Sequence, residues 1–266
     1  MRSSLGMIIL LLSASLVHAK LELRDVAASH GQLGPVRESR EYVRGDDVYV
    51  RFTVAGFQRD EDGRTNAEMN LVVTDKKGKI LGKKAIPFQR VIALGGDSFP
   101  AEATVAVDEN FAPGEYAVTV VFKDLLADES AEFKYEFKCK SAEFTVASVR
   151  FYQDAQGRAP APVGGVVGQS LFIKSRIVGF DKSQGEIDLQ IDMEPLDAQG
   201  KPLVPKPIRV VFHNENPKEV AQFSSINFSG ELALNRAGDF RLRITARDLK
   251  KKTTATFETP MRVVAP

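Results

Sequence analysis

The sequence predicts an all-β chain in which two copies of one antiparallel β-sandwich follow a cleaved signal peptide. Three observations predict this organisation. The first residues have the pattern of an export signal, the rest of the chain repeats itself, and the repeated segments alternate apolar with polar positions. An alternation with a period of two is typical of strands that bury one face in an antiparallel sheet.

The export signal is predicted over residues 1–19. Arg2 supplies a positive start, residues 5–17 are mostly apolar, and Val17-His18-Ala19 offers the small or apolar positions that a signal peptidase recognises. Roughly 13 apolar residues are too few for a transmembrane helix, which needs about 20. We therefore expect cleavage after Ala19 and export to the periplasm, the cell surface or the medium, with no membrane span in the remaining chain.

The internal repeat consists of three blocks that recur in the same order at offsets between 122 and 124 residues. Blocks that keep their order with so few gaps indicate a duplicated module. The matching pairs are residues 45–57 with 168–180, 75–81 with 197–203, and 112–125 with 236–249.

The two copies meet at a short junction. Residues 144–146 end the last predicted strand of the first copy, and residues 149–151 begin the first strand of the second. The predicted domains are therefore residues 20–146 and 147–266, each large enough to hold its own core. Because no Gly/Ser-rich spacer separates them, we expect little bending at the junction.

Each copy contains segments with clean strand alternation, bounded by turn residues. Glycine closes the turns that begin at Asp75 and Asp197, where a hairpin tip needs a positive φ. Several short strands separated by such turns predict a sandwich. The positions expected to face the cores are Tyr116, Val118, Val120 and Phe122 in the first copy, and Phe240, Leu242, Ile244 and Ala246 in the second.

The segments around Pro113-Gly114-Glu115-Tyr116 and Ala237-Gly238-Asp239-Phe240 each run through a strand to an Asp-Leu turn. In this the chain resembles bacterial immunoglobulin-like or fibronectin type III-like domains. The resemblance implies that Tyr116 forms a corner tying the two sheets together, while Phe240 lacks the hydroxyl for one. The family's buried tryptophan and disulfide are both missing. Such modules serve as spacers, adhesion elements or binding domains, and the fold does not choose among these roles.

The residues that most enzymes require are scarce. Beyond the predicted signal there are two histidines, His30 and His213, both expected at the surface, and there is no Gly-x-Ser-x-Gly motif. Cys139 continues an apolar strand face, so we expect a buried, inert thiol; pairing between chains is the alternative. One cysteine excludes an internal disulfide and a cysteine-based zinc site. The sequence therefore predicts no enzyme and no cofactor.

The sequence suggests two further kinds of site, a calcium loop and a glycan-binding surface. Asp60-Glu61-Asp62-Gly63 places carboxylates before a glycine, as calcium loops do, but most of the loop's other ligands are missing, so a solvated turn is favoured. Sandwich modules also bind glycans, usually through exposed Trp or Tyr. This chain has no Trp and only 5 Tyr beside 17 Phe, which makes a glycan-binding module a lesser alternative.

Charge divides unequally between the copies. Residues 147–266 hold 17 Lys and Arg against 13 Asp and Glu, whereas residues 20–146 hold 18 against 22. The near-neutral sum argues against a nucleic-acid binder. We predict a basic face in the second copy that binds an acidic protein, an anionic polymer, or the acidic copy of another molecule; a solvated surface is the alternative. The residues of this face are Arg241, Arg243, Arg247, Lys250, Lys251 and Lys252.

The sequence as a whole predicts an exported, non-enzymatic binding or spacing protein of two modules that acts at the cell envelope. The alternatives are an accessory subunit of an exported enzyme or secretion complex and, less favoured, a glycan-binding module. Self-association through the opposite charges of the two copies is a further expectation.

Overall fold

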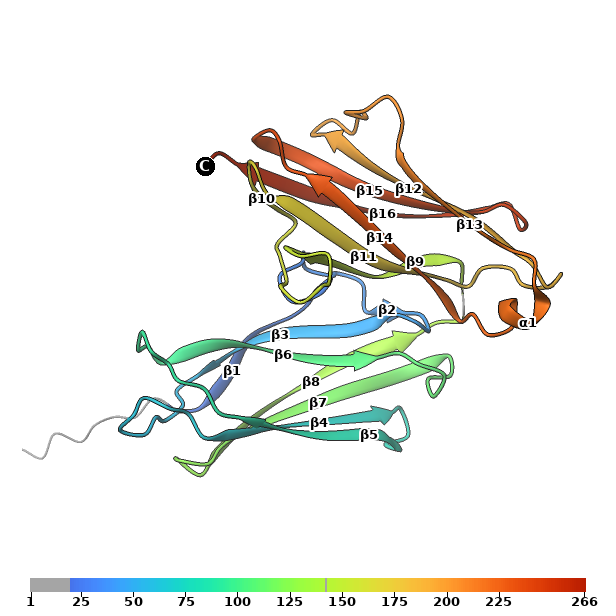
Figure 1. Cartoon of the computed structure of the whole chain (residues 1–266). Coiled ribbons are helices and arrows are strands. Elements are labelled where there is room, and N and C mark those ends of the chain that lie inside the picture. Colours follow the sequence, from blue (N-terminus) through green and yellow to red (C-terminus); the bar gives the residue numbers. More distant parts are fainter. Residues whose placement is uncertain (1–19, 142) are drawn as a thin grey trace, which may run out of the picture.

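The computed structural model describes residues 20–141 and 143–266, and its regular structure is almost entirely β-strand, which confirms the all-β prediction. Figure 1 shows two sandwiches, the first built from β1 to β8 and the second from β9 to β16. The predicted signal peptide, residues 1–19, lies outside the described residues. No helix in the described part of the chain is long and apolar enough to cross a membrane.

The first sandwich packs a three-stranded sheet against a five-stranded sheet. The three-stranded sheet has the order β1 (Glu22–Ala28), β3 (Asp47–Ala55), β6 (Ser98–Ala106). The five-stranded sheet has the order β2 (Glu41–Tyr42), β8 (Glu129–Cys139), β7 (Gly114–Asp124), β4 (Ala67–Asp75), β5 (Ile80–Phe88).

The second sandwich repeats this arrangement strand for strand. Its three-stranded sheet has the order β9 (Thr145–Tyr152), β11 (Ser170–Val178), β14 (Ser225–Ala233). Its five-stranded sheet has the order β10 (Gly164–Val166), β16 (Thr253–Val264), β15 (Gly238–Asp248), β12 (Ile187–Asp197), β13 (Ile208–Asn214). A single helical turn, α1 (Pro217–Val220), lies between β13 and β14. Since β9 begins at Thr145, the boundary predicted between residues 146 and 147 falls inside this strand.

The strand order is that of an immunoglobulin-like sandwich. In each copy the first, second and fifth main strands share one sheet, and the third, fourth, sixth and seventh share the other. The pairing is antiparallel except at one short strand in each copy, where β2 runs parallel to β8 and β10 runs parallel to β16. These two parallel pairs are an exception to the predicted antiparallel pairing. The alternation of apolar and polar residues could not reveal them, because it does not depend on strand direction.

Each sandwich encloses its own apolar core. The alternating positions predicted on β7 and β15 are buried, and Phe122, Leu242 and Ile244 are fully inaccessible to solvent. The two cores are separate clusters, one from residues 21–139 and one from residues 146–263. Because the apolar period-two positions face inward on both sheets, the hydrophobic effect fixes which face of each strand is buried.

The turns expected at the repeated Asp-x-x-Gly segments have the same geometry in both copies. Asp75 Oδ1 accepts hydrogen bonds from the backbone N–H groups of the two residues at positions 77 and 79, and Asp197 Oδ1 accepts the same pair two and four residues on. Gly78 and Gly200 have φ of 80° and 85°, a conformation that favours glycine. The conserved spacing of this block is therefore explained by turn geometry.

The repeated Asp-Leu pair is also structural. The carboxylates of Asp124 and Asp248 are buried, and each accepts backbone hydrogen bonds from two turns at once. Asp124 accepts from the N–H of Gln58 at 2.6 Å, and Asp248 accepts from the N–H of Asp181 at 2.7 Å. A buried carboxylate is stable only when its oxygens are hydrogen-bonded, which these contacts provide.

The two sandwiches are joined by a buried polar contact. Asp46 and Asp47, at the start of β3, are 3% and 8% exposed. Asp46 Oδ1 accepts a hydrogen bond from the Ser148 N–H at 3.0 Å, and Asp47 Oδ2 contacts the Ser148 hydroxyl and the Arg150 guanidinium. A small apolar cluster lies beside these groups: Val43, Ala147 and Val178. Charge-assisted hydrogen bonds in a buried site hold two elements in one geometry.

Candidate functional site

The two sandwiches differ at the loop that joins their two sheets. The loop between β6 and β7 spans residues 107–113, whereas the loop between β14 and β15 spans only residues 234–237. In the longer loop Phe111 is buried, with its ring 5.0 Å from the ring of Tyr116. The Tyr116 hydroxyl donates a hydrogen bond to the Ala112 carbonyl at 2.7 Å, which forms the corner implied by the family resemblance. Phe111 therefore closes this end of the first sandwich.

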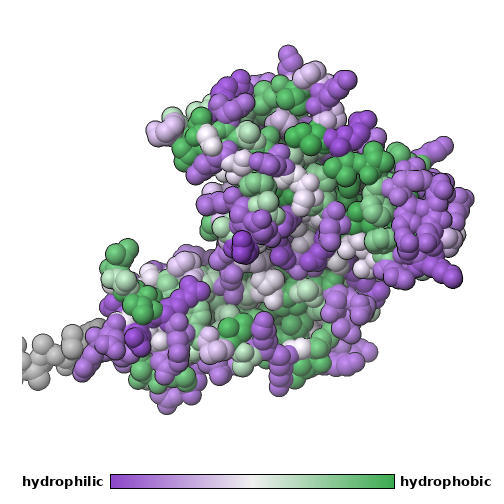
Figure 2. All heavy atoms as spheres, in the orientation of Figure 1, coloured by the Kyte–Doolittle hydropathy of each residue, from purple (hydrophilic) through white to green (hydrophobic). Residues whose placement is uncertain are grey.

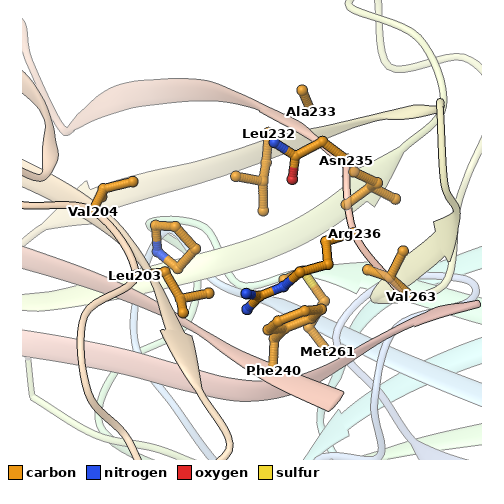
Figure 3. Close-up of a pocket in the computed structure, with 11 residues that line it drawn as sticks. Leu203, Val204, Leu232, Ala233, Asn235, Arg236, Phe240, Met261 and Val263 are labelled. Carbon is orange, nitrogen blue, oxygen red and sulfur yellow. The ribbon is translucent and has the colours of Figure 1, made fainter. Parts of the chain in front are cut away.

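The shorter loop of the second sandwich has no aromatic side chain to close the same end. A slot of about 470 Å³ opens there between the two sheets, as Figure 3 shows. The slot lies at this end because the β14–β15 loop is three residues shorter than the β6–β7 loop and does not cover the space between the sheets. The apolar side chains around the slot include Leu203, Val204, Leu232, Phe240, Met261 and Val263.

One cation lies in this apolar slot. The Arg236 guanidinium extends over the Phe240 ring, 5.1 Å from its centroid, and points towards Leu203 (Figure 3). Among residues 20–141 and 143–266 no carboxylate lies within ion-pair distance of Arg236. Apolar side chains beside the Asn235 amide and the unneutralised Arg236 guanidinium suit a ligand group that has an apolar part and carries one negative charge.

The slot adjoins an open sheet edge. β13 pairs only with β12, and its residues Ile208, Val210 and Val211 are 42%, 40% and 59% exposed. Figure 2 shows hydrophobic residues gathered on the second sandwich in the region that β13 occupies in Figure 1. Leu203 and Val204, which line the slot, belong to the loop that leads into β13. The slot and the strand edge therefore form one continuous surface, which we name the β13 edge site.

The hydrogen-bonding groups of this edge can be assigned from the register. The Leu249 N–H donates to the Asp188 carbonyl, so Asp188 faces β15 and the next residue, Leu189, faces β13, where it pairs with Phe212. Since neighbouring residues of a strand point their N–H and C=O groups to opposite sides, those of Arg209, Val211 and His213 point away from β12. They are available to a further strand.

The corresponding edge of the first sandwich is protected. β5 carries Lys83, Lys84 and Pro87, and its register with β4 shifts between Val73 and Thr74. Lysine, proline and a bulge are the features with which natural sheets block edge-to-edge pairing. β13 has no proline and no register shift. Both edges are unpaired within the described residues, but only that of the second sandwich lacks lysine, proline and a bulge.

The predicted basic face is partly neutralised, because four of its six residues form ion pairs. Arg241 and Arg243 both pair with Glu258, at 2.5 and 2.8 Å, and these guanidinium groups hold the pKa of that carboxyl below its usual range. The other two pairs are Arg247 with Asp192 and Lys250 with Glu186. Of the six predicted residues, Lys251 and Lys252 are exposed and have no ion pair within the described residues. The face therefore carries less positive charge than the count of basic residues predicts, because Glu258, Asp192 and Glu186 approach it from other segments of the chain.

The arginines around Asp192 form a compact group on the outer face of the five-stranded sheet. Burial opposes ionisation of Asp192, but hydrogen bonds from Arg209 and Arg247 hold its pKa below the usual range. Arg209 lies on β13, so this contact fixes the side chain of an edge residue.

The remaining candidates have structural roles. Cys139 is 1% exposed, and burial raises the pKa of its thiol, as expected for an inert core residue. Asp60 Oδ1 accepts hydrogen bonds from the Asp62 and Arg64 N–H groups, so this carboxylate caps its own turn.

The surface prediction for His30 is wrong. Its ring packs edge-on against Phe257 of the second sandwich, with the ring centroids 5.0 Å apart. Burial, with a smaller contribution from Arg37, lowers the pKa of His30 to about 4. The prediction rested on the turn-like neighbours of His30, and the contact with Phe257, which is distant in sequence, could not be predicted from them.

His213 is exposed as predicted, but it is not isolated. Its ring and the carboxylates of Glu186 and Glu215 come within 4.8 Å of one another, which makes these residues the described group best able to hold a metal ion. Sequence reasoning missed the group because Glu186 is distant in sequence, although the His213-x-Glu215 spacing was visible.

Comparison with known proteins adds little. No family model and no curated protein matches the chain. Among solved structures it is similar to red sea bream transglutaminase, at 10% identity and a TM-score of 0.30, covering 92% of this chain and 31% of that one. It is also similar to the C-terminal domain of the Streptococcus agalactiae AgI/II polypeptide BspA, at 10% identity and a TM-score of 0.31, covering 89% of this chain and 99% of that one. The chain thus spans less than a third of the transglutaminase, and TM-scores this low carry no argument about function.

Proposed function

We propose that this chain is an exported, non-enzymatic protein that binds an extended segment of a partner protein at the β13 edge site. The added segment pairs with β13, places one apolar side chain in the slot, and directs a carboxylate to Arg236. The observation that carries this proposal is the slot itself, which exists because the second sandwich lacks the closing residue Phe111.

Strand addition fits the groups that this edge offers. The outward N–H and C=O groups of β13 supply hydrogen bonds without regard to sequence, while the slot selects a side chain. The unneutralised charge of Arg236 favours a segment that carries an acidic residue or a terminal carboxylate. The polar contact between the sandwiches supports a second contribution, since it holds this site at a fixed distance from the first sandwich.

A selection from a library of random displayed peptides against the purified chain tests this function. The enriched peptides should alternate apolar residues and contain at least one carboxylate. The Val211→Pro variant removes an outward N–H without removing a hydrogen bond to β12, so the sandwich stays folded while strand addition is blocked. We expect Val211→Pro to weaken binding at least about tenfold, the effect of one or two lost backbone hydrogen bonds.

Two controls accompany this variant. Val211→Thr keeps the N–H and a β-branched side chain, so it should bind as the native chain does. Arg236→Glu should remove the preference for acidic peptides and keep pairing to the edge. Equal binding by Val211→Pro and the native chain, or enrichment of peptides without alternation, would contradict strand addition.

A further inference from the structure

A second site lies at the other end of β13, away from the slot. Glu186 immediately precedes β12, while His213 is in β13 and Glu215 follows it. Because β12 and β13 are antiparallel, the start of one strand and the end of the other meet at this end of the sheet. The pairing of Ile187 with Asn214 brings the three side chains to one side of the hairpin.

The spacing of these groups suits a transition-metal ion. His213 Nε2 lies 2.9 Å from Glu215 Oε1, and one ligand atom from each of the three residues falls within 4.8 Å of the others. Two ligands bound to zinc at about 2.0–2.2 Å stand roughly 3–3.5 Å apart in tetrahedral geometry. The His–Glu pair is therefore close to ligand spacing already, whereas Glu186 must first leave the Lys250 ammonium.

The other nitrogen of the imidazole also has a carboxylate nearby. His213 Nδ1 lies 3.8 Å from Asp188 Oδ1, and Asp188 is fixed by its place within β12. In metal sites a ligating histidine directs its second ring nitrogen to a carboxylate, which orients the ring and raises its basicity. At 3.8 Å this contact is longer than a hydrogen bond, so Asp188 must move closer to the ring to complete that arrangement.

We infer that Glu186, His213 and Glu215 form a binding site for a divalent transition-metal ion such as zinc, with Asp188 positioning the histidine. One nitrogen and two carboxylate oxygens favour zinc over calcium, which takes oxygen ligands only. Three protein ligands leave a fourth position for water or for a group from another molecule. Since the site stands on different residues from the slot and Arg236, it does not depend on the proposed peptide binding.

Lys250 is the cation that now contacts this cluster. Its ammonium lies 2.7 Å from Glu186 Oε2, and the hydrogen bond to Glu186, with the charges of Asp188 and Glu215, raises the pKa of Lys250. Desolvation opposes this rise. A metal ion and the Lys250 ammonium compete for the same carboxylate. Removing the ammonium should therefore strengthen metal binding, which an unrelated surface site would not show.

Calorimetric titration of the chain, purified without a histidine tag, with zinc chloride and separately with calcium chloride tests this site. We expect one zinc ion per chain, no calcium binding, and binding at least about tenfold weaker in His213→Ala and Glu215→Gln. Lys250→Ala should bind zinc more tightly than the native chain. His213 is exposed, so its variant should fold, and circular dichroism would verify this.

A matched control uses the acidic turn of the first sandwich. Asp62→Asn removes one carboxylate from an acidic turn that contains no histidine, so this variant should bind zinc as the native chain does. Zinc should also raise the melting temperature of the native chain and leave that of His213→Ala unchanged, because only a ligand bound to the folded state stabilises it. Zinc binding that survives His213→Ala, or that is lost in Asp62→Asn, would overturn the site.

Discussion

Phe111 in the first sandwich and Asn235–Arg236 in the second occupy corresponding ends of two modules with the same strand order. In the first, an aromatic side chain and a tyrosine hydroxyl close the space between the sheets. In the second, a loop shorter by three residues leaves that space open and places a guanidinium in it. The comparison teaches that the duplicated scaffold keeps its pairing and turns while its ends and edges have changed.

The largest loss of stability should come from removing the side chain that closes the end of the first sandwich, so that this end is open like that of the second. Phe111→Ala removes a buried aromatic ring and should destabilise the first sandwich by about 3–5 kcal/mol. Chemical denaturation would measure the loss. The reciprocal change, Asn235→Phe in the second sandwich, should fill the slot and abolish peptide selection while leaving the fold intact. A loss below 1 kcal/mol in Phe111→Ala, on the order of a surface substitution, would show that Phe111 does not close this end.

A second effect should depend on pH, because His30 lies between the sandwiches. Its pKa of about 4 in the folded chain is below the ordinary value of 6.5, so protonation favours the unfolded chain. Stability should be complete above pH 6.5 and fall as the pH drops towards 4, by at most about 3 kcal/mol. Comparing denaturation of the native chain and His30→Gln across this range would isolate the histidine's share, since other groups titrate in both. Identical pH profiles of stability for the native chain and His30→Gln would contradict this role of His30.

The smallest effect should come from the corner. Tyr116→Phe makes the first sandwich like the second at this position and removes one hydrogen bond to the Ala112 carbonyl. We expect a loss of about 1 kcal/mol, measurable as a lower melting temperature of the first sandwich. Phe240→Tyr in the second sandwich is the matched change. We expect no gain in stability, because the loop that holds Arg236, the counterpart of Ala112, is three residues shorter. A gain there would mean that the two ends are more alike than their loops indicate.

The strands and their buried faces could be predicted because they depend on local alternation. Phe122 and Leu242 are inaccessible to solvent as the period of two indicates, and the Asp75 and Asp197 turns follow from short, repeated signals. The interpretation of the surface was less successful. The basic residues were counted correctly, but Glu258, Asp192 and Glu186, which form ion pairs with four of them, reach them from other strands or from just before one.

The slot and the metal-ligand group needed the structure for the same reason. The loops at residues 107–113 and 234–237 differ in length, but the shorter loop leaves a slot only because the buried Phe111 of the first sandwich has no aromatic counterpart in the second. Glu186 and His213 are brought together only by the antiparallel register of β12 and β13. A loop-length comparison between the copies is the one sequence signal that would have located the slot.

The blocked edge of β5 limits what the open edge of β13 can build. A protein with two open edges at its larger sheets adds subunits at both and grows into a fibre. Here Lys83, Lys84 and Pro87 prevent one of the two additions. If β13 accepts a strand as proposed, growth through the β13 and β5 edges therefore ends after a single addition, and these two edges cannot build a fibre.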